Sequence, residues 1–169
     1  MVDLADRIKV LFVCMGNICR SPAAEGVFRD YVRRTGQDIL IQIDSAGTIG
    51  FHAGSPPDQR MQEAASRRGY RLDSLARQVN RDDFGEFDLI IAMDHANLED
   101  LKEITDGAAG HVRLLGSFLD TTGPADTIPA VPDPYYGGMD GFEQVLDMIE
   151  SACPAVLEYC LGIADNRSR

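Results

Sequence analysis

The strongest constraint on the fold is a short, nearly continuous apolar run at residues 8–13. A strand without polar alternation is buried on both faces, which is typical of a parallel sheet covered by helices. Further predicted strands and helices alternate along the chain, which favours a parallel sheet layered between helices. The predicted strands are residues 8–13, 39–43, 87–93 and 112–115, and the predicted helices are residues 21–35, 58–68, 95–104 and 142–161.

Length and composition limit the classes of function. A chain of 169 residues fits one domain, residues 1–169, and 44% hydrophobic with 25% charged residues is ordinary for a globular protein. No apolar run approaches the roughly 20 residues that span a bilayer. The net charge of −11 argues against nucleic acid or an acidic membrane surface as a partner. Four cysteines are too few for a secreted disulfide scaffold, so we predict a reducing, cytoplasmic setting.

The segment after the first strand has the pattern of an anion site. A helix start is predicted at Ser21-Pro22, with the hydroxyl as N-cap and the proline at the first helical position. Ligands of parallel sheets bind beyond the carboxyl ends of the strands. That rule indicates three places: the loop after Val13, the segment after Asp44 and the turn at Asp94.

The loop between strand and helix, here named the Cys–Arg loop (residues 14–20), carries a nucleophile and a cation. Its backbone amides and the helix N-terminus favour an anion, and the Arg20 guanidinium can bind two phosphate oxygens. The same partial charges favour the thiolate of Cys14, the form that attacks phosphorus, and Ser21 is placed to donate its hydroxyl to that sulfur. The alternative is that Cys14 is a core residue that ends a strand.

A second candidate lies in the Gly- and Pro-rich stretch at residues 123–141, which shows no periodicity. A long stretch of this kind in a small domain is usually functional. It contains Asp133, a carboxylic acid that can protonate a leaving oxygen and then activate water. The alternative is that Asp133-Pro134 forms an ordinary turn.

Together these motifs resemble the low-molecular-weight protein tyrosine phosphatases, over nearly the whole chain. The resemblance implies a four-stranded parallel sheet with helices on both faces, no metal, no cofactor and a covalent cysteinyl-phosphate intermediate. It implies a protein bearing phosphotyrosine as substrate, Asp133 as general acid, and phosphate binding by Met15, Gly16, Asn17, Ile18, Cys19 and Arg20. The matching segments are residues 13–22, 44–48, 76–78, 87–88, 93–94 and 133–137.

The resemblance also assigns supporting roles. Asn17 and Ser45 are expected to hold the loop in shape, and Phe51, Tyr135 and Tyr136 are expected to form the walls of the substrate pocket. Phe51 is equally well explained as a scattered aromatic residue. Many relatives carry histidine where this chain has Ser74, so we expect somewhat weaker support of the loop.

The remaining cysteines and histidines have simpler interpretations. The resemblance suggests that Cys19 forms a disulfide with Cys14 under oxidation, which protects the nucleophile; alternatively Cys19 is a small loop residue. Cys153 and Cys160 lie seven residues apart on one helix face, where buried packing is the expected role. The three histidines show no metal-ligand spacing.

Three other functions compete with tyrosine phosphatase activity. Arsenate reduction would require further cysteines near the site, and there are none between Cys19 and Cys153. Phosphoarginine hydrolysis is disfavoured because relatives of that type tend to carry threonine at the position of Ile18. A non-catalytic phosphopeptide-binding module would be expected to lack Cys14, Arg20 or Asp133, and all three are present.

Overall fold

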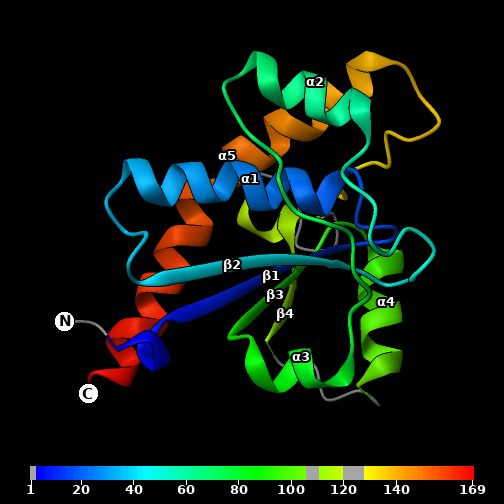
Figure 1. The fold of residues 1–169 in the computed structure, drawn as a ribbon. Helices are drawn as coiled ribbons and strands as arrows, with labels where there is room; N and C mark the ends of the chain where they lie inside the picture. The colour runs from blue at the N-terminus through cyan, green and yellow to red at the C-terminus, as the bar shows by residue number, and fades with distance from the viewer. Residues whose placement is uncertain (1–2, 106–110, 120–127) are drawn as a thin grey trace.

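A parallel sheet lies at the centre of the computed structural model, which describes residues 3–105, 111–119 and 128–169 (Figure 1). Its strands are ordered β2-β1-β3-β4, and every neighbouring pair is parallel. The predicted four-stranded parallel sheet is therefore confirmed. The strands are β1 (Ile8–Cys14), β2 (Ile41–Gly47), β3 (Leu89–Ala92) and β4 (Val112–Leu114).

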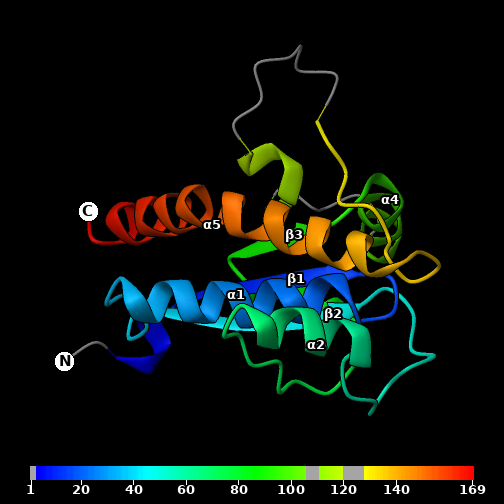
Figure 2. The ribbon, with the colours of Figure 1, turned by 90° about the horizontal axis from the view of Figure 1, so that it is seen from above.

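Helices cover both faces of this sheet (Figures 1 and 2). Alternate residues of β1 enter two different cores: Val10 and Phe12 pack with α1 and α5, whereas Leu11 and Val13 pack with Leu101 of α4. This double burial explains the uninterrupted apolar run at the start of the chain. One face carries α1 (Arg20–Arg34), α2 (Gln59–Arg67) and α5 (Met139–Arg167), and the other carries α3 (Arg81–Glu86) and α4 (His95–Ile104).

The strand order places a topological switch point at the carboxyl end of β1. The chain leaves β1 toward β2 on one side and later returns to β3 on the other side. At such a point the two connections diverge and leave a crevice outside the strand ends. The Cys–Arg loop occupies this position, directly between β1 and α1.

Two of the predicted boundaries are wrong. Helix α1 begins at Arg20 with Cys19 as its N-cap, so Ser21 does not cap the helix. Its hydroxyl instead lies 3.0 Å from the sulfur of Cys14. Strand β2 begins at Ile41 rather than at residue 39 because Leu40 closes a turn onto Gln37. The strand then continues to Gly47, since pairing with β1 extends that far.

Other predicted elements also differ from the observed ones. Helix α3 was missed, the predicted strand at residues 87–93 is only Leu89–Ala92, and α5 extends beyond residues 142–161 at both ends. Of the stretch 123–141, residues 123–127 lie outside the described part, 128–138 form neither helix nor strand, and 139–141 are helical. Two 3-10 turns, Leu4–Asp6 and Leu115–Phe118, complete the fold. Among the described residues, no helix combines the length and apolarity that crossing a membrane requires.

Candidate active site

The three places indicated by the strand ends meet around the Cys–Arg loop. The N–H of Thr48, just after β2, donates to the carbonyl of Cys14 at 2.9 Å, and the next N–H, of Ile49, donates to the carbonyl of Met15 at 3.1 Å. Asp94, just after β3, accepts a hydrogen bond from Arg20 at 2.6 Å. The carboxyl ends of β1, β2 and β3 therefore build one site.

The nucleophile candidate, Cys14, ends β1 with its sulfur next to the start of α1. Its Sγ lies 3.0 Å from Ser21 Oγ, in a buried contact. Ser21 Oγ accepts a hydrogen bond from Asn17 Nδ2 at 2.8 Å, so its own proton can be donated to the Cys14 sulfur or to the carbonyl of Ala46, 3.4 Å away. No side chain caps the N-terminus of α1, so the first turn of this helix presents its partial positive charge to the loop.

Asn17 fixes the shape of the loop. It is 2% exposed, and its φ of 56° makes it the one non-glycine residue with positive φ in the described part of the chain. Asparagine tolerates this left-handed conformation better than most residues do. Its Nδ2 also donates to Ser45 Oγ at 3.0 Å, and its Oδ1 accepts from the backbone N–H of Arg77 at 3.0 Å.

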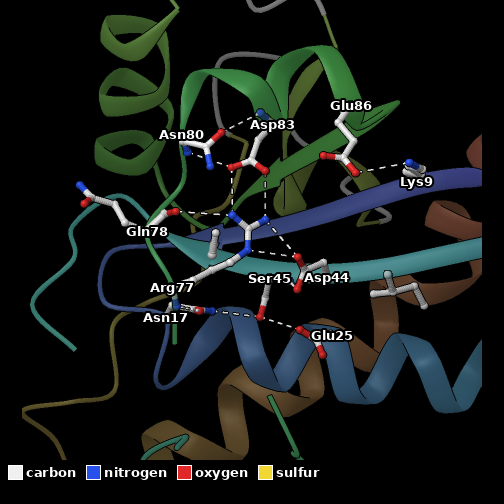
Figure 3. A network of polar contacts seen from close by, with 12 residues as sticks. Lys9, Asn17, Glu25, Asp44, Ser45, Arg77, Gln78, Asn80, Asp83 and Glu86 are labelled. Atoms are coloured by element: carbon white, nitrogen blue, oxygen red, sulfur yellow. Dashed lines mark hydrogen bonds and ion pairs between the residues drawn. The ribbon is translucent and has the colours of Figure 1, made fainter. Parts of the chain in front are cut away.

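The chain of polar contacts continues into α1 through a residue that the sequence analysis missed. Ser45 Oγ donates to Glu25 Oε1 at 2.7 Å (Figure 3). The other oxygen of this buried carboxylate is paired with Arg29 at 2.8 Å. Ser74 does not take the place of the histidine common in relatives. In the described structure the side-chain bonds of Asn17 go to Ser21, Ser45 and Arg77.

The guanidinium of Arg20 is oriented from the opposite side. The residue is 2% exposed, and its Nη1 donates to Asp94 Oδ2 at 2.6 Å and to the carbonyl of Val131 at 3.1 Å. Asp94 is itself held as the N-cap of α4, where it accepts from the N–H of Asn97 at 2.7 Å. The strand-end rule indicated the turn at Asp94, but nothing local in the sequence links its carboxylate to Arg20, 74 positions away.

The candidate general acid reaches the same point from the segment before α5. Asp133 Oδ2 lies 3.7 Å from Arg20 Nη2, and the carboxyl side chain is 41% exposed. Its Oδ1 accepts from the N–H of Tyr135 at 3.1 Å, an Asx turn of the kind considered as the alternative to catalysis. Upstream, the N–H of Val131 donates to the carbonyl of Met93 at 2.8 Å and ties this segment to the end of β3.

These groups open onto one cavity of ≈ 310 Å³. Cys14, Arg20 and Asp133 line it together with the predicted wall residues Phe51, Tyr135 and Tyr136. Phe51 and Tyr136 are 84% and 92% exposed. The lining residues are Cys14, Met15, Gly16, Ile18, Cys19, Arg20, Ile49, Phe51, His52, Asp133, Tyr135 and Tyr136.

Two features of the cavity wall were not expected. His52, one of the three histidines without metal-ligand spacing, lines the cavity edge-to-face with Phe51, with ring centroids 4.9 Å apart. The guanidinium of Arg60 lies 5.5 Å from the ring of Tyr135, while Asp58 holds Arg60 through two hydrogen bonds. The N–H of Asp58 donates to the carbonyl of Ile18, so the wall and the loop share a support.

The four cysteines are all free and buried. Burial first, and then the charge of Asp58, raises the pKa of Cys19 to about 12, and burial also raises the pKa values of Cys153 and Cys160 to about 12. These three thiols are therefore neutral at physiological pH. Among the described residues, no three side chains of the metal-binding types cluster closely enough to hold a metal ion.

Known proteins resemble this chain along most of its length. The model of the family described as low molecular weight phosphotyrosine protein phosphatase matches residues 9–163. A low molecular weight protein-tyrosine-phosphatase of Streptomyces coelicolor is 45% identical, over 88% of this chain and 91% of its own length. The crystal structure of YfkJ from Bacillus subtilis is similar with a TM-score of 0.83 and 40% identity, covering 92% of this chain and 96% of that one. The Drosophila arginine phosphatase DARP is similar with a TM-score of 0.79 and 34% identity, covering 90% and 97%.

Proposed function

The chain belongs to the low molecular weight phosphotyrosine protein phosphatase family and is a protein-tyrosine phosphatase, and from this premise we propose how its residues divide the reaction. Cys14 is the nucleophile, the amides of the Cys–Arg loop and the Arg20 guanidinium bind the phosphoryl oxygens, and Asp133 is the general acid. The observation that carries this assignment is the shared cavity that these three side chains line, with Arg20 Nη2 3.7 Å from Asp133 Oδ2.

In the first step the Cys14 thiolate attacks phosphorus, the S–P bond forms and the bond from phosphorus to the phenolic oxygen breaks. The carboxylic acid of Asp133 gives its proton to the departing oxygen. In the second step the Asp133 carboxylate takes a proton from water, the water oxygen bonds to phosphorus and the S–P bond breaks. Phosphate leaves and the thiolate is restored, so no cofactor or metal enters the balance.

Hydrolysis of an aryl phosphate by wild type, Cys14→Ser and Asp133→Ala tests these roles. We expect no detectable turnover from Cys14→Ser. For Asp133→Ala we expect a loss on the order of 10²–10⁴-fold, the usual contribution of a general acid. Full activity of Asp133→Ala would show that the Asx turn is the only role of this aspartate.

The substrate is proposed to be a protein that bears phosphotyrosine, with no nucleic acid or membrane partner. The rings of Phe51, Tyr135 and Tyr136 form flat apolar walls that fit a phosphorylated aromatic side chain better than phosphoserine. Peptides that differ only in phosphotyrosine, phosphoserine or phosphoarginine test this proposal. Faster hydrolysis of the phosphoarginine peptide would favour the rival activity instead.

Cys19 is proposed to protect the nucleophile. Peroxide would oxidise the Cys14 thiolate to a sulfenic acid, and the Cys19 thiol would then form the S–S bond and release water. Both sulfurs border the same cavity. After mild peroxide treatment, reductant should restore activity in wild type but not in Cys19→Ala. Equal recovery of both proteins would overturn this role.

Residues 1–169 are proposed to act as one phosphatase domain in the reducing cytoplasm. The single sheet and its two cores support one domain. The setting follows from the chemistry, because the nucleophile must remain a free thiol, and all four cysteines are free.

A further inference from the structure

Arg77 does not line the cavity, but it is bonded to Asn17 of the loop that does (Figure 3). Its backbone N–H donates to Asn17 Oδ1 at 3.0 Å, and its carbonyl accepts from the N–H of Gly47 at 2.8 Å. One residue thus touches both the loop and the end of β2. A side chain at Gly47 would lie 2.7 Å from the carbonyl of Met15, so β2 and the loop are packed without spare space.

The side chain of Arg77 extends the other way and binds two carboxylates. Nε and Nη2 donate to Asp44 Oδ2 at 3.1 and 3.0 Å, while Nη1 and Nη2 donate to the two oxygens of Asp83 at 3.0 and 3.1 Å (Figure 3). Asp44 belongs to β2 and Asp83 to α3. The guanidinium therefore joins two elements through four charge-assisted bonds, a geometry that its planar fork allows.

Asp83 is fixed independently of Arg77. It forms a capping box with Asn80, in which the Asp83 carboxylate accepts from the Asn80 N–H at 2.8 Å and the Asn80 side chain accepts from the Asp83 N–H at 3.2 Å. The residue is 4% exposed, so its charge needs a partner. Helix α3 is short, but its start is rigid and serves as an anchor for the guanidinium.

The positive φ of Asn17 explains why this anchor matters for the loop. The backbone of Asn17 is in the left-handed conformation, which persists only if surrounding contacts hold it. Its side-chain amide supplies such contacts as long as the hydrogen-bond partners of the amide stay in place. Ser21 and Ser45 bind its Nδ2, and Oδ1 accepts from Arg77. We propose that Arg77 is a positioning residue of the phosphatase: by holding its own backbone N–H against Asn17, it sets the direction of the loop amides that bind phosphate. This inference rests on the proposed function of the Cys–Arg loop.

Arg77→Lys tests the proposal, because an ammonium group cannot bridge both carboxylates as the guanidinium does. We expect kcat/KM for an aryl phosphate to fall about 10- to 100-fold, as small misplacements of binding groups do. The inhibition constant of inorganic phosphate should rise by a comparable factor, since phosphate uses the same amides. A variant with wild-type kcat/KM and wild-type phosphate inhibition would overturn the proposal.

Arg68→Lys is the matched control. Arg68 also binds several carboxylates, those of Glu143, Asp147 and Glu150, but it joins α2 to α5 and has no contact with the Cys–Arg loop. The Arg68→Lys variant should have a lower free energy of unfolding than wild type but an unchanged inhibition constant for inorganic phosphate. If both variants lose activity in proportion to their stability, Arg77 has no special role. Cys14→Ser tests the proposed function separately. Turnover that persists in Cys14→Ser would refute that function, whereas loss of turnover in Cys14→Ser together with wild-type behaviour of Arg77→Lys would overturn this inference alone.

A double-mutant comparison shows whether Arg77 acts through Asn17. Asn17→Gly keeps the positive φ accessible and removes the amide that Arg77 holds. If Arg77 acts through this amide, kcat/KM of the double variant Asn17→Gly/Arg77→Lys should be less than twofold below that of Asn17→Gly alone. Full additivity of the two losses would overturn the proposed route, even if Arg77→Lys alone is impaired.

Discussion

The four cysteine sulfurs of this chain have different partners. Cys19, Cys153 and Cys160 are buried, and their pKa values are raised to about 12, mainly by burial. Cys14 is also buried, but its sulfur lies 3.0 Å from the Ser21 hydroxyl, a group that can donate to a thiolate. Residue type alone therefore does not identify the nucleophile.

We predict that iodoacetamide at pH 7 modifies Cys14 selectively. A thiol with a pKa of about 12 is ionised in roughly one molecule in 10⁵ at that pH, so the other three cysteines should stay unmodified. Peptide mass spectrometry would measure the label, and inorganic phosphate should protect Cys14. Modification of Cys19 at the rate of Cys14 would contradict this distinction.

Asn17 combines a strained backbone with three hydrogen bonds, and a pair of variants separates the two contributions. Asn17→Gly and Asn17→Ala both remove the amide, so both should lose about 10- to 100-fold in kcat/KM. Glycine adopts φ near 56° without strain, whereas alanine does not. The free energy of unfolding of Asn17→Gly should therefore be about 1 kcal/mol higher than that of Asn17→Ala. Wild-type turnover of Asn17→Gly would mean that the backbone conformation alone shapes the loop.

At the scale of elements, the segment before α5 connects the general acid to the sheet. Its carbonyl at Val131 holds Arg20, and its N–H is bonded to the end of β3. The carbonyl of Pro129 lies so close to Gly116 that a Cβ there would be 1.8 Å from the oxygen. The absence of a side chain at Gly116 therefore determines where this segment runs.

Gly116→Ala is predicted to displace this segment. The clash is with backbone, so we expect a loss of about 1–3 kcal/mol in the free energy of unfolding and a lower kcat, because Arg20 and Asp133 both depend on the segment. Gly162→Ala, in α5 with nothing within 4 Å, is the control and should be neutral or stabilising by up to about 1 kcal/mol. Urea unfolding and aryl phosphate kinetics measure the two effects, and wild-type values for Gly116→Ala would contradict this prediction.

The elements also show which parts of the molecule the sequence could predict. The strand, the Cys–Arg loop and the start of α1 are contiguous, so their anion-site pattern could be recognised directly. Helix α3 was missed although Asn80 and Asp83 match a capping box, because six residues carry little periodicity. Asp94 and Arg77 lie 74 and 60 residues from their loop partners, and only the folded sheet brings them together.

For the whole molecule, a net charge of −11 gives no attraction to an anionic substrate. Phosphate affinity must arise locally, from the loop amides and Arg20, since salt screens the distant charges beyond about 8 Å. The polar contacts around the loop reach β2, α1 and α3 (Figure 3). Arg20 adds the N-terminus of α4 through Asp94, so much of the fold serves to hold this one site.

The buried thiols also make global stability depend on pH. The unfolded chain releases these protons near the ordinary pKa of 9.0, whereas the folded chain keeps them up to about pH 12. The unfolded state therefore binds fewer protons above pH 9, and the free energy of unfolding falls by about 1.4 kcal/mol per pH unit for each such thiol. Cys153→Ala should make this slope shallower by about that amount in urea titrations between pH 9 and 11. An unchanged slope would contradict the prediction.

The central claim is that the Cys–Arg loop holds a phosphoryl group against the sulfur of Cys14, and trapping that group tests it most directly. The Asp133→Ala variant should accumulate the intermediate from an aryl phosphate whose leaving group needs no proton, because its second step lacks the base. After rapid alkaline quenching, we predict about one labelled phosphate per chain, located on Cys14 by mass spectrometry. Turnover without any label on Cys14, or with the label on another residue, would contradict the account.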